Sequence, residues 1–218
     1  MCFIASRVTS GVINMKLNCL AVVIALFVLS RSAFSGIILT NVSPTYSQNF
    51  NTLASSGATG SAVPSGWQFS ESGSSANTTY GIGTGSSATG NTYSFGLAND
   101  SDRALGGLRS GTLVPVFGAA FQNGGTSSLL NLSVSYFGEQ WRVGAANRVD
   151  QLDFQFSKDA SSVTTGTWSD LNSLDFVRSG SATTGAVNGN QTANRQNLIG
   201  SLSGVNLGIG DTVWLRWT

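Results

Sequence analysis

The sequence predicts an all-β protein folded as a two-sheet antiparallel sandwich. Short segments alternate between apolar and polar residues, as where Leu152, Phe154 and Phe156 enclose Asp153 and Gln155. A period of two is typical of half-buried strands. Turns rich in Gly, Ser, Thr and Asn separate these segments, and no stretch shows a sustained helical period. Many short strands between turns favour a sandwich or a barrel, and we expect the sandwich.

The first 35 residues have the features of a secretory signal peptide. Arg7 and Lys16 supply positive charge, residues 19–29 form an apolar run of eleven, and small residues end the segment at Ser35. The run is shorter than the roughly 20 apolar residues that a membrane-spanning helix needs. We expect cleavage after Ser35, and Met15 is an alternative start of translation.

The composition of residues 36–218, the predicted mature chain, limits its partners. Both cysteines, Cys2 and Cys19, lie in the leader, so the mature chain forms no disulfide. Without the leader, eight basic residues stand against ten acidic ones, a net charge of −2. No basic cluster offers a site for the nucleic-acid backbone or for an anionic membrane surface. We expect a secreted bacterial protein, extracellular or at the cell surface, that uses no cofactor and binds no nucleic acid through this domain.

The first half of the mature chain predicts several short strands. The apolar segment at residues 37–50 contains Pro44, which indicates an edge or a turn. Residues 71–91 are almost all small and polar, yet Tyr80 and Ile82 have the spacing of inward residues in a short strand. Further apolar segments are residues 92–97, 103–108 and 111–121, the last with Pro115 at an edge or a bulge.

Residues 129–142, with the sequence LLNLSVSYFGEQWR, contain the most distinctive pattern of the chain. A turn signal at residues 122–125 precedes them and predicts a hairpin with the strand before. Leu, Val and Tyr alternate with Asn and Ser over the first half of the segment, which predicts a half-buried strand. Gly138 then interrupts the alternation and predicts a bulge that re-aims the side chains of Glu139, Gln140, Trp141 and Arg142.

The final segment, residues 213–217, alternates cleanly. Val213, Leu215 and Trp217 share one face, whereas Trp214 and Arg216 lie on the other. The chain ends within this alternation, without a terminating turn. We therefore expect residues 36–218 to form one domain that is truncated at its carboxyl end and lacks one or more closing strands.

The residue types exclude several kinds of catalytic site. The chain has no histidine, which excludes Ser-His-Asp and Cys-His systems and histidine zinc sites. Its eight aspartates lack the spacing of a calcium loop, and no metal site is predicted. Glycoside hydrolysis needs two carboxylates, and Glu71 and Glu139 are the only glutamates. No catalytic residue is assigned, and Glu139, with Trp141 beside it for stacking on a sugar ring, is the remaining candidate.

A structural role for Glu139 is favoured over a catalytic one. The carboxylate is expected to form an ion pair with Arg142 at the strand end, or with Arg103 or Arg216 when the strands assemble. Buried charges persist when they are paired and hydrogen-bonded, and such networks resemble functional clusters in a sequence.

Two of the five tryptophans are candidates for contact with a ligand, while most are expected in the core. Trp214 shares a strand face with Arg216, opposite the apolar face, and is therefore expected to point outward or to line a groove. Trp141 is the second candidate because it lies close to Glu139 in the sequence.

Five phrases occur together in this chain: NFNTL at residues 49–53, VPSGW at 63–67, DRALG at 102–106, YFGEQWR at 136–142 and DTVWLRW at 211–217. Together they resemble a bacterial exported module of PEP-CTERM-sorted proteins, which also occurs in larger extracellular proteins with lamin-tail or nuclease-type domains. The resemblance implies a jelly-roll or concanavalin-like sandwich without an established activity of its own. The acidic turn and final strand that usually follow are absent, as is a sorting tail, which leaves anchoring and any ligand site in that turn open.

The sequence favours a non-catalytic module with a structural, adhesive or ligand-binding role. Extracellular polysaccharide or matrix is the expected partner, and membrane contact is expected only through the signal peptide or a missing carboxyl-terminal anchor. The alternative is an extracellular hydrolase, either a glycosidase that uses Glu139 or the accessory module of a phosphoesterase or nuclease-type enzyme.

Overall fold

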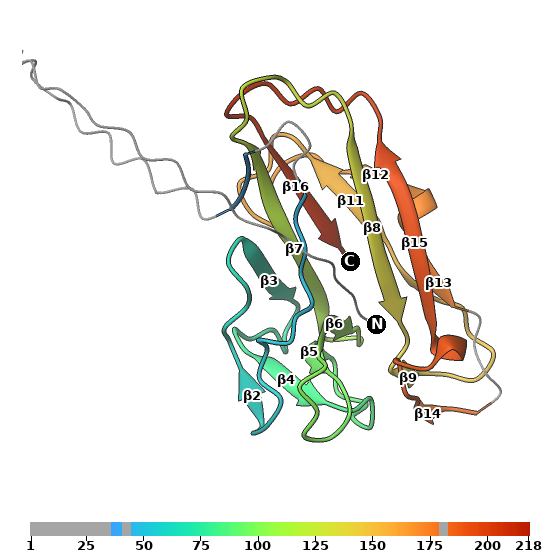
Figure 1. The fold of residues 1–218 in the computed structure, drawn as a ribbon. Helices are drawn as coiled ribbons and strands as arrows, with labels where there is room; N and C mark the ends of the chain where they lie inside the picture. The colour runs from blue at the N-terminus through green and yellow to red at the C-terminus, as the bar shows by residue number, and fades with distance from the viewer. Residues whose placement is uncertain (1–35, 41–44, 179–182) are drawn as a thin grey trace, which may run out of the picture.

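The computed structural model describes residues 36–40, 45–178 and 183–218. The predicted signal peptide and Pro44 lie outside the described residues. Within them the chain folds as an all-β sandwich, which confirms the predicted fold class (Figure 1). Two short 3₁₀ helices, η1 Asn172–Leu174 and η2 Thr192–Asn194, are the helical elements of this part of the chain.

The first sheet is built around a long central strand, β7. Its strands are β1 Ile37–Leu39, β3 Trp67–Ser72, β7 Val114–Asn123, β11 Phe154–Ser157, β12 Ser169–Asp170 and β16 Thr212–Trp217. One edge of β7 pairs antiparallel with β16, which is followed by β11 and β12. The other edge pairs antiparallel with β3 and, nearer its end, parallel with β1.

The facing layer contains the antiparallel pair of β8 Leu132–Glu139 and β15 Arg195–Leu202. Figure 1 shows this pair opposite β16 and β11, with a four-stranded sheet beside the lower parts of β3 and β7. That sheet contains β2 Thr59–Gly60, β4 Tyr80–Gly83, β5 Asn91–Phe95 and β6 Ala104–Leu108. Two small pairs complete the fold: β9 Arg142–Val143 with β14 Gly185–Ala186, and β10 Asp150–Leu152 with β13 Phe176–Arg178. Most pairings are antiparallel, but β4 pairs parallel with β5, as β1 does with β7.

Aromatic rings connect the two layers around Trp217, which is 4% exposed. Trp217 stacks with Trp67 and Phe117 at centroid distances of 5.7 and 6.1 Å. It also makes edge contacts with Phe154 at 5.2 Å and with Tyr136 at 5.6 Å. Three of these partners belong to the first sheet, whereas Tyr136 lies on β8. The alternation at the end of the sequence therefore correctly predicted the inward face of β16.

The turn at residues 122–125 does not form the predicted hairpin. β7 pairs with β16, β3 and β1, whereas β8 pairs with β15, so this turn carries the chain from one layer to the other. The Nδ2 group of Asn123 secures the turn by donating hydrogen bonds to the carbonyl oxygens of Ser127 and Leu207, both at 2.9 Å. A turn signal predicts that the chain changes direction, but the pairing of β8 depends on residues much later in the sequence.

Pro115 lies at a local edge of the first sheet. β16 pairs with residues 117–122 of β7, and Pro115 lies beyond this stretch, opposite Glu71 of β3. Because a proline has no N–H to donate, it fits where β7 has a strand on one side only. This position agrees with the edge predicted from the sequence.

Gly138 allows two strands to pack closely and does not form the predicted bulge. β8 pairs with β15 in a continuous register in which Gly138 lies opposite Gln196, so the bulge prediction is wrong. A Cβ atom at this position would overlap the ring of Phe176 in β13. The glycine is required because that ring lies directly on the backbone of β8.

Replacing Gly138 with alanine is expected to lower the free energy of unfolding by about 1–3 kcal/mol, because the added methyl group overpacks the core. Denaturant titration measures the loss. Gly111→Ala is the matched control, since no atom lies within 4 Å of a Cβ added there, and its effect should stay within about 0.5 kcal/mol. Equal stabilities of the two variants would contradict this account of Gly138.

Candidate functional site

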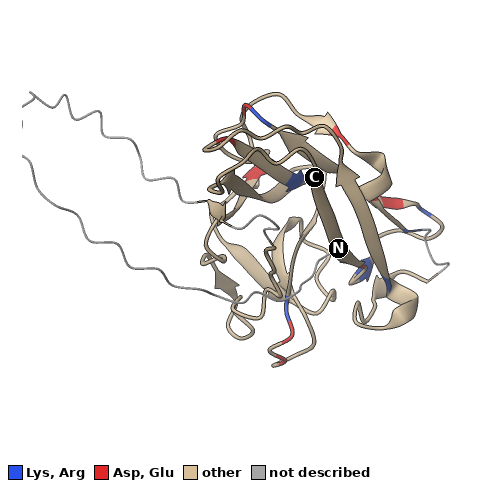
Figure 2. Ribbon diagram, turned by 45° about the horizontal axis from the view of Figure 1, so that its top comes forward, with Lys and Arg blue, Asp and Glu red and all other residues tan. Residues whose placement is uncertain are grey.

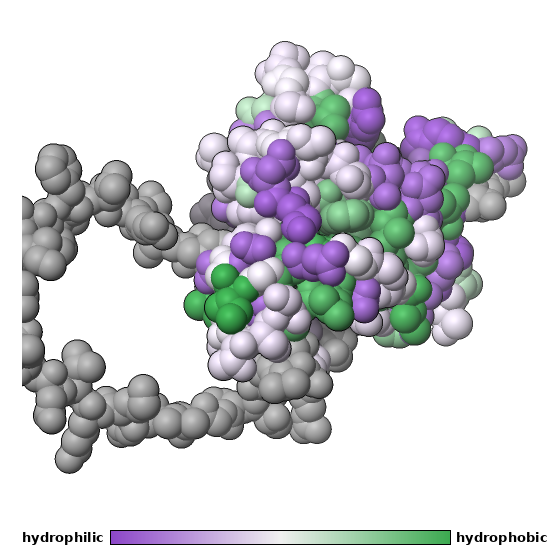
Figure 3. All heavy atoms as spheres, turned by 90° about the horizontal axis from the view of Figure 1, so that it is seen from above, coloured by the Kyte–Doolittle hydropathy of each residue, from purple (hydrophilic) through white to green (hydrophobic). Residues whose placement is uncertain are grey.

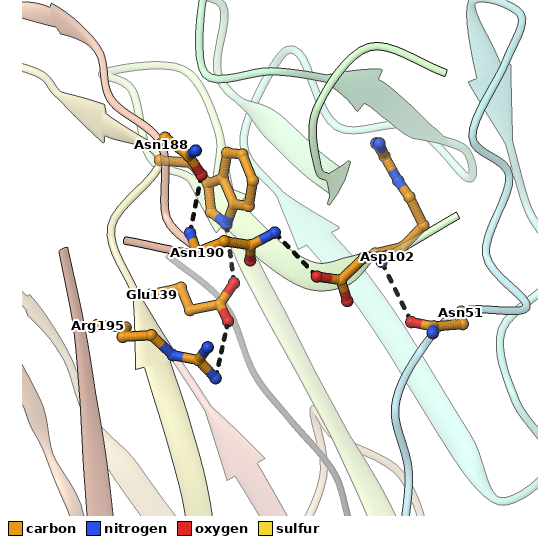
Figure 4. A network of polar contacts seen from close by, with 8 residues as sticks. Asn51, Asp102, Glu139, Asn188, Asn190 and Arg195 are labelled. Atoms are coloured by element: carbon orange, nitrogen blue, oxygen red, sulfur yellow. Dashed lines mark hydrogen bonds and ion pairs between the residues drawn. The ribbon is translucent and has the colours of Figure 1, made fainter. Parts of the chain in front are cut away.

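Glu139 ends β8 and lies opposite Arg195, the first residue of β15. Its Oε2 accepts a hydrogen bond from Trp141 Nε1 at 3.1 Å, and Arg195 Nη2 lies 3.7 Å from its Oε1 (Figure 4). The side chain of Glu139 is 9% exposed, and that of Arg195 is 33% exposed. Both carboxylate oxygens are thus engaged by groups of the protein itself.

Burial dominates the ionisation of Glu139. Removal of the carboxylate from water raises the pKa of Glu139 from 4.5 to about 7, although the Trp141 hydrogen bond and the charge of Arg195 act in the opposite direction. Asp102 adds a further, smaller increase to this pKa. The desolvation of the carboxylate therefore outweighs its attraction to a partly exposed arginine.

The loop before β15 covers this end of β8. Asn190 Nδ2 donates a hydrogen bond to Asp102 Oδ2 at 2.8 Å, and the backbone N–H of Asn190 donates to Asn188 Oδ1 at 3.0 Å (Figure 4). Gly189 lies so close to the Trp141 indole that a Cβ atom there would overlap the ring. The loop, the segment before β6 and the end of β8 meet here and close the site against solvent.

Glu139 pairs with Arg195, so the predicted pairing with Arg142, Arg103 or Arg216 is corrected. These three arginines donate hydrogen bonds elsewhere, and Arg216 also lies over the Trp168 ring at 3.9 Å from its centroid. Their acceptors include Gly85 and Ser86 for Arg142, Ser94 and Leu97 for Arg103, and Gln155 and Val163 for Arg216. Sequence reasoning missed Arg195 because only the register of β15 against β8 brings it to Glu139.

Trp141 and Trp214 are both buried, at 1% and 6% exposure. Trp141 stacks with Phe95 at a centroid distance of 6.4 Å. Trp214 packs with Ala120 and Val163 in a small cluster on the outer face of the first sheet. Trp214 thus lies on the face opposite Val213, Leu215 and Trp217, as predicted, but the segment that carries Val163 covers this face, so the ring is neither exposed nor open to a ligand. Neither ring offers a surface for stacking with a ligand.

A cavity of about 480 Å³ lies beside the end of β8. Gln140 and Arg142 line it, whereas Glu139 and Trp141 do not. The alternation of side chains along an extended chain accounts for this division. The other charged residues of the wall are Arg109, Arg148, Asp150 and Asp153, and its apolar part includes Leu108, Pro115 and Leu152.

Gln140 is the most unusual residue of the cavity wall. It is 5% exposed, and its side-chain Nε2 has no hydrogen-bond partner in the described part of the chain. Sequence reasoning placed Gln140 in the distinctive segment but gave it no role. An amide between Glu139 and Trp141 carries no signal of its own, and the cavity is built from segments that are distant in sequence.

Charged side chains are sparse on the described surface, and Figure 2 shows acidic and basic residues scattered over both layers. Exposed apolar residues are dispersed as well, among them Ile199, Ile209 and Leu130, and Figure 3 shows apolar and polar residues interspersed on the visible face. Within the described residues, no group of three or more Asp, Glu, Cys or His lies close enough to hold a metal ion. That part of the chain also contains no helix long and apolar enough to cross a membrane.

The fold and the site define an all-β sandwich with a polar and apolar cavity at the end of β8. Comparisons of the chain with protein-family models, with curated proteins and with solved structures gave no match.

The contribution of Glu139 to stability is expected to fall as the pH rises from about 4.5 to about 7. Because its pKa is higher in the folded than in the unfolded chain, the folded protein holds the proton more tightly in this range, and ionisation favours unfolding. Glu139→Gln removes this pH dependence and should be at least as stable as the wild type at about pH 8. Denaturant titrations at about pH 5 and about pH 8 measure both effects.

Glu139→Ala is the contrasting variant. It leaves the buried Trp141 Nε1 without its acceptor, so its free energy of unfolding should be lower than that of Glu139→Gln at both pH values. A marked loss of stability of Glu139→Gln at the higher pH would show instead that attraction to Arg195 outweighs burial.

Proposed function

We propose that this chain is a secreted, non-catalytic module that binds an extracellular saccharide of a bacterial surface or matrix through the cavity beside β8. The cavity is the observation on which this proposal rests. Its volume of about 480 Å³ lies within the roughly 300–1,000 Å³ typical of small-molecule sites. Its wall combines arginine and aspartate side chains, a buried amide and apolar residues, a combination suited to a ligand with both hydroxyl groups and C–H faces.

Sequence features support the extracellular part of the proposal. Residues 1–35 have the charge and apolar pattern of a signal peptide, and the five phrases that begin with NFNTL resemble exported bacterial modules. The low, balanced charge of the chain argues against a nucleic acid or an anionic membrane surface as the partner. A jelly-roll arrangement of the strands remains part of this proposal.

A hydrolase is the alternative, and the raised pKa of Glu139, about 7, favours it because such a value suits a general acid. The position of Glu139 argues against this role. Its carboxylate binds Trp141 and Arg195 and does not line the cavity. Of the two aspartates in the wall, Asp150 forms an ion pair with Arg148 at 2.6 Å. The cavity thus lacks two available carboxylates for glycoside hydrolysis.

The binding and catalytic functions predict different results for Glu139→Gln. A binding module retains its saccharide affinity in this variant, because the carboxylate lies outside the cavity, and releases no sugar in either form. Calorimetric titration with a panel of acidic and neutral monosaccharides and disaccharides measures affinity, and a reducing-sugar assay measures turnover. Turnover by the wild type that disappears in Glu139→Gln would establish the hydrolase instead.

Val114→Trp tests the cavity itself. Val114 lines the cavity at the start of β7, so an indole there should occupy the ligand's space and abolish binding. The unfolding transition of this variant, measured in parallel, separates blocked binding from loss of the fold. Unchanged affinity in a folded Val114→Trp would place the ligand elsewhere.

A further inference from the structure

We infer that the cavity recognises a carboxylate carried by a sugar-sized, hydroxylated ligand, and that Gln140, Arg142 and Arg109 hold this group. The inference rests on the proposed binding function and specifies its ligand. Sugar acids and the uronate residues of acidic polysaccharides share this chemistry.

The charges of the wall favour an anion. Arg148 and Asp150 neutralise each other through their ion pair at 2.6 Å. Arg142 donates to two carbonyl oxygens, which are neutral acceptors and leave its positive charge uncompensated. Arg109 is exposed and forms no ion pair within the described chain. Counted over side chains alone, the three arginines and two aspartates of the wall have a net charge of +1, with Asp153 as the acid that forms no ion pair within the described residues.

Gln140 supplies the second, independent observation. Buried polar groups are almost always hydrogen-bonded, yet Nε2 of this 5% exposed residue has no partner in the described chain. Because Nε2 is enclosed by the protein, the amide must turn toward the cavity before a ligand oxygen can accept a hydrogen bond from it. A carboxylate has two acceptor oxygens, so it can accept from the amide and from a guanidinium at once.

The other residues of the cavity wall indicate the chemistry of the rest of the ligand. Leu108, Pro115 and Leu152 offer apolar contacts for the C–H faces of a sugar ring. Asp153, another residue of the wall, can accept a hydrogen bond from a ligand hydroxyl. Asp153 Oδ1 already accepts a hydrogen bond from Gln151 Nε2 at 2.5 Å, which leaves Oδ2 for a ligand hydroxyl. A simple anion such as acetate would make no contact with the apolar residues, and a fully apolar acid would desolvate Oδ2 without supplying a donor.

Galacturonate and galactose test the inference because they differ at a single carbon, which carries a carboxylate in one and a hydroxymethyl group in the other. Galacturonate should bind at least about tenfold more tightly than galactose in calorimetric titrations of the full chain, as expected for charge-assisted hydrogen bonds. Its affinity should also fall as the salt concentration rises. A galacturonate trimer distinguishes the two sources of the carboxylate. If the natural ligand is the end of a polysaccharide, the trimer should bind at least as tightly as galacturonate, whereas a site for a free sugar acid should bind galacturonate alone.

Arg109→Gln is the variant of choice because the side chain is exposed and forms no ion pair with the residues that the structure describes. It should weaken galacturonate binding by about tenfold and weaken galactose binding by a clearly smaller factor. Lys158→Gln removes the same charge outside the cavity wall and is the matched control, with no expected effect. Gln140→Leu keeps the buried volume but lacks the hydrogen-bond donor. It should lower the affinity for galacturonate by a similar factor.

Each remaining result overturns one of the two claims. Equal affinities for galactose and galacturonate would reject the carboxylate and leave the saccharide-binding function standing. Binding of acetate as tight as that of galacturonate would show a general anion site. Absence of binding by any saccharide of the panel would reject the proposed function itself. Unchanged affinity in both Arg109→Gln and Gln140→Leu would reject the assignment to this cavity.

Discussion

The contact between Trp217 and Tyr136 joins the two layers of the sandwich, and much of the core is arranged around it. Trp217 lies on the inner face of β16, between Phe117 of β7 and Phe154 of β11, which are its register partners on either side. Tyr136 approaches from β8 at a ring distance of 5.6 Å. Such ring pairs favour particular distances and orientations, so they set how β8 lies on the first sheet as well as how much apolar surface is buried.

The position of β8 explains the separate roles of four consecutive residues at its end. Glu139 and Trp141 turn toward the protein and bind each other at 3.1 Å, under the loop before β15. Gln140 and Arg142 turn the other way and line the cavity. The residue with the most obvious chemistry is therefore enclosed, and the less conspicuous amide faces the space where a ligand can enter. Side chains alternate along an extended chain, which places these residues on opposite sides. The packing around the Trp141 ring holds the segment in this orientation.

Burial also determines the electrostatics of this region more than pairing does. Glu139 has an arginine at 3.7 Å, yet removal from water raises the pKa of its carboxyl to about 7. Arg142, by contrast, keeps its charge at the cavity with carbonyl oxygens as partners. Glu139 does not line the cavity, whose charge is set by its own arginine and aspartate side chains.

The sequence by itself determined the all-β class, the turns and the inward faces of single strands, because these depend on local periodicity and turn chemistry. The face of β16 with Val213, Leu215 and Trp217 is an example.

Only the tertiary structure decided which strands pair and which exposed faces become covered. The pairing of Arg195 with Glu139, the burial of Trp214 under the segment of Val163 and the overlap that requires Gly138 all involve residues far apart in the chain. The cavity belongs to the same group, since its wall combines β6, β7, β9 and β10. The local pattern indicates whether a residue favours a buried or an exposed position. Long-range packing determines which neighbours it contacts there.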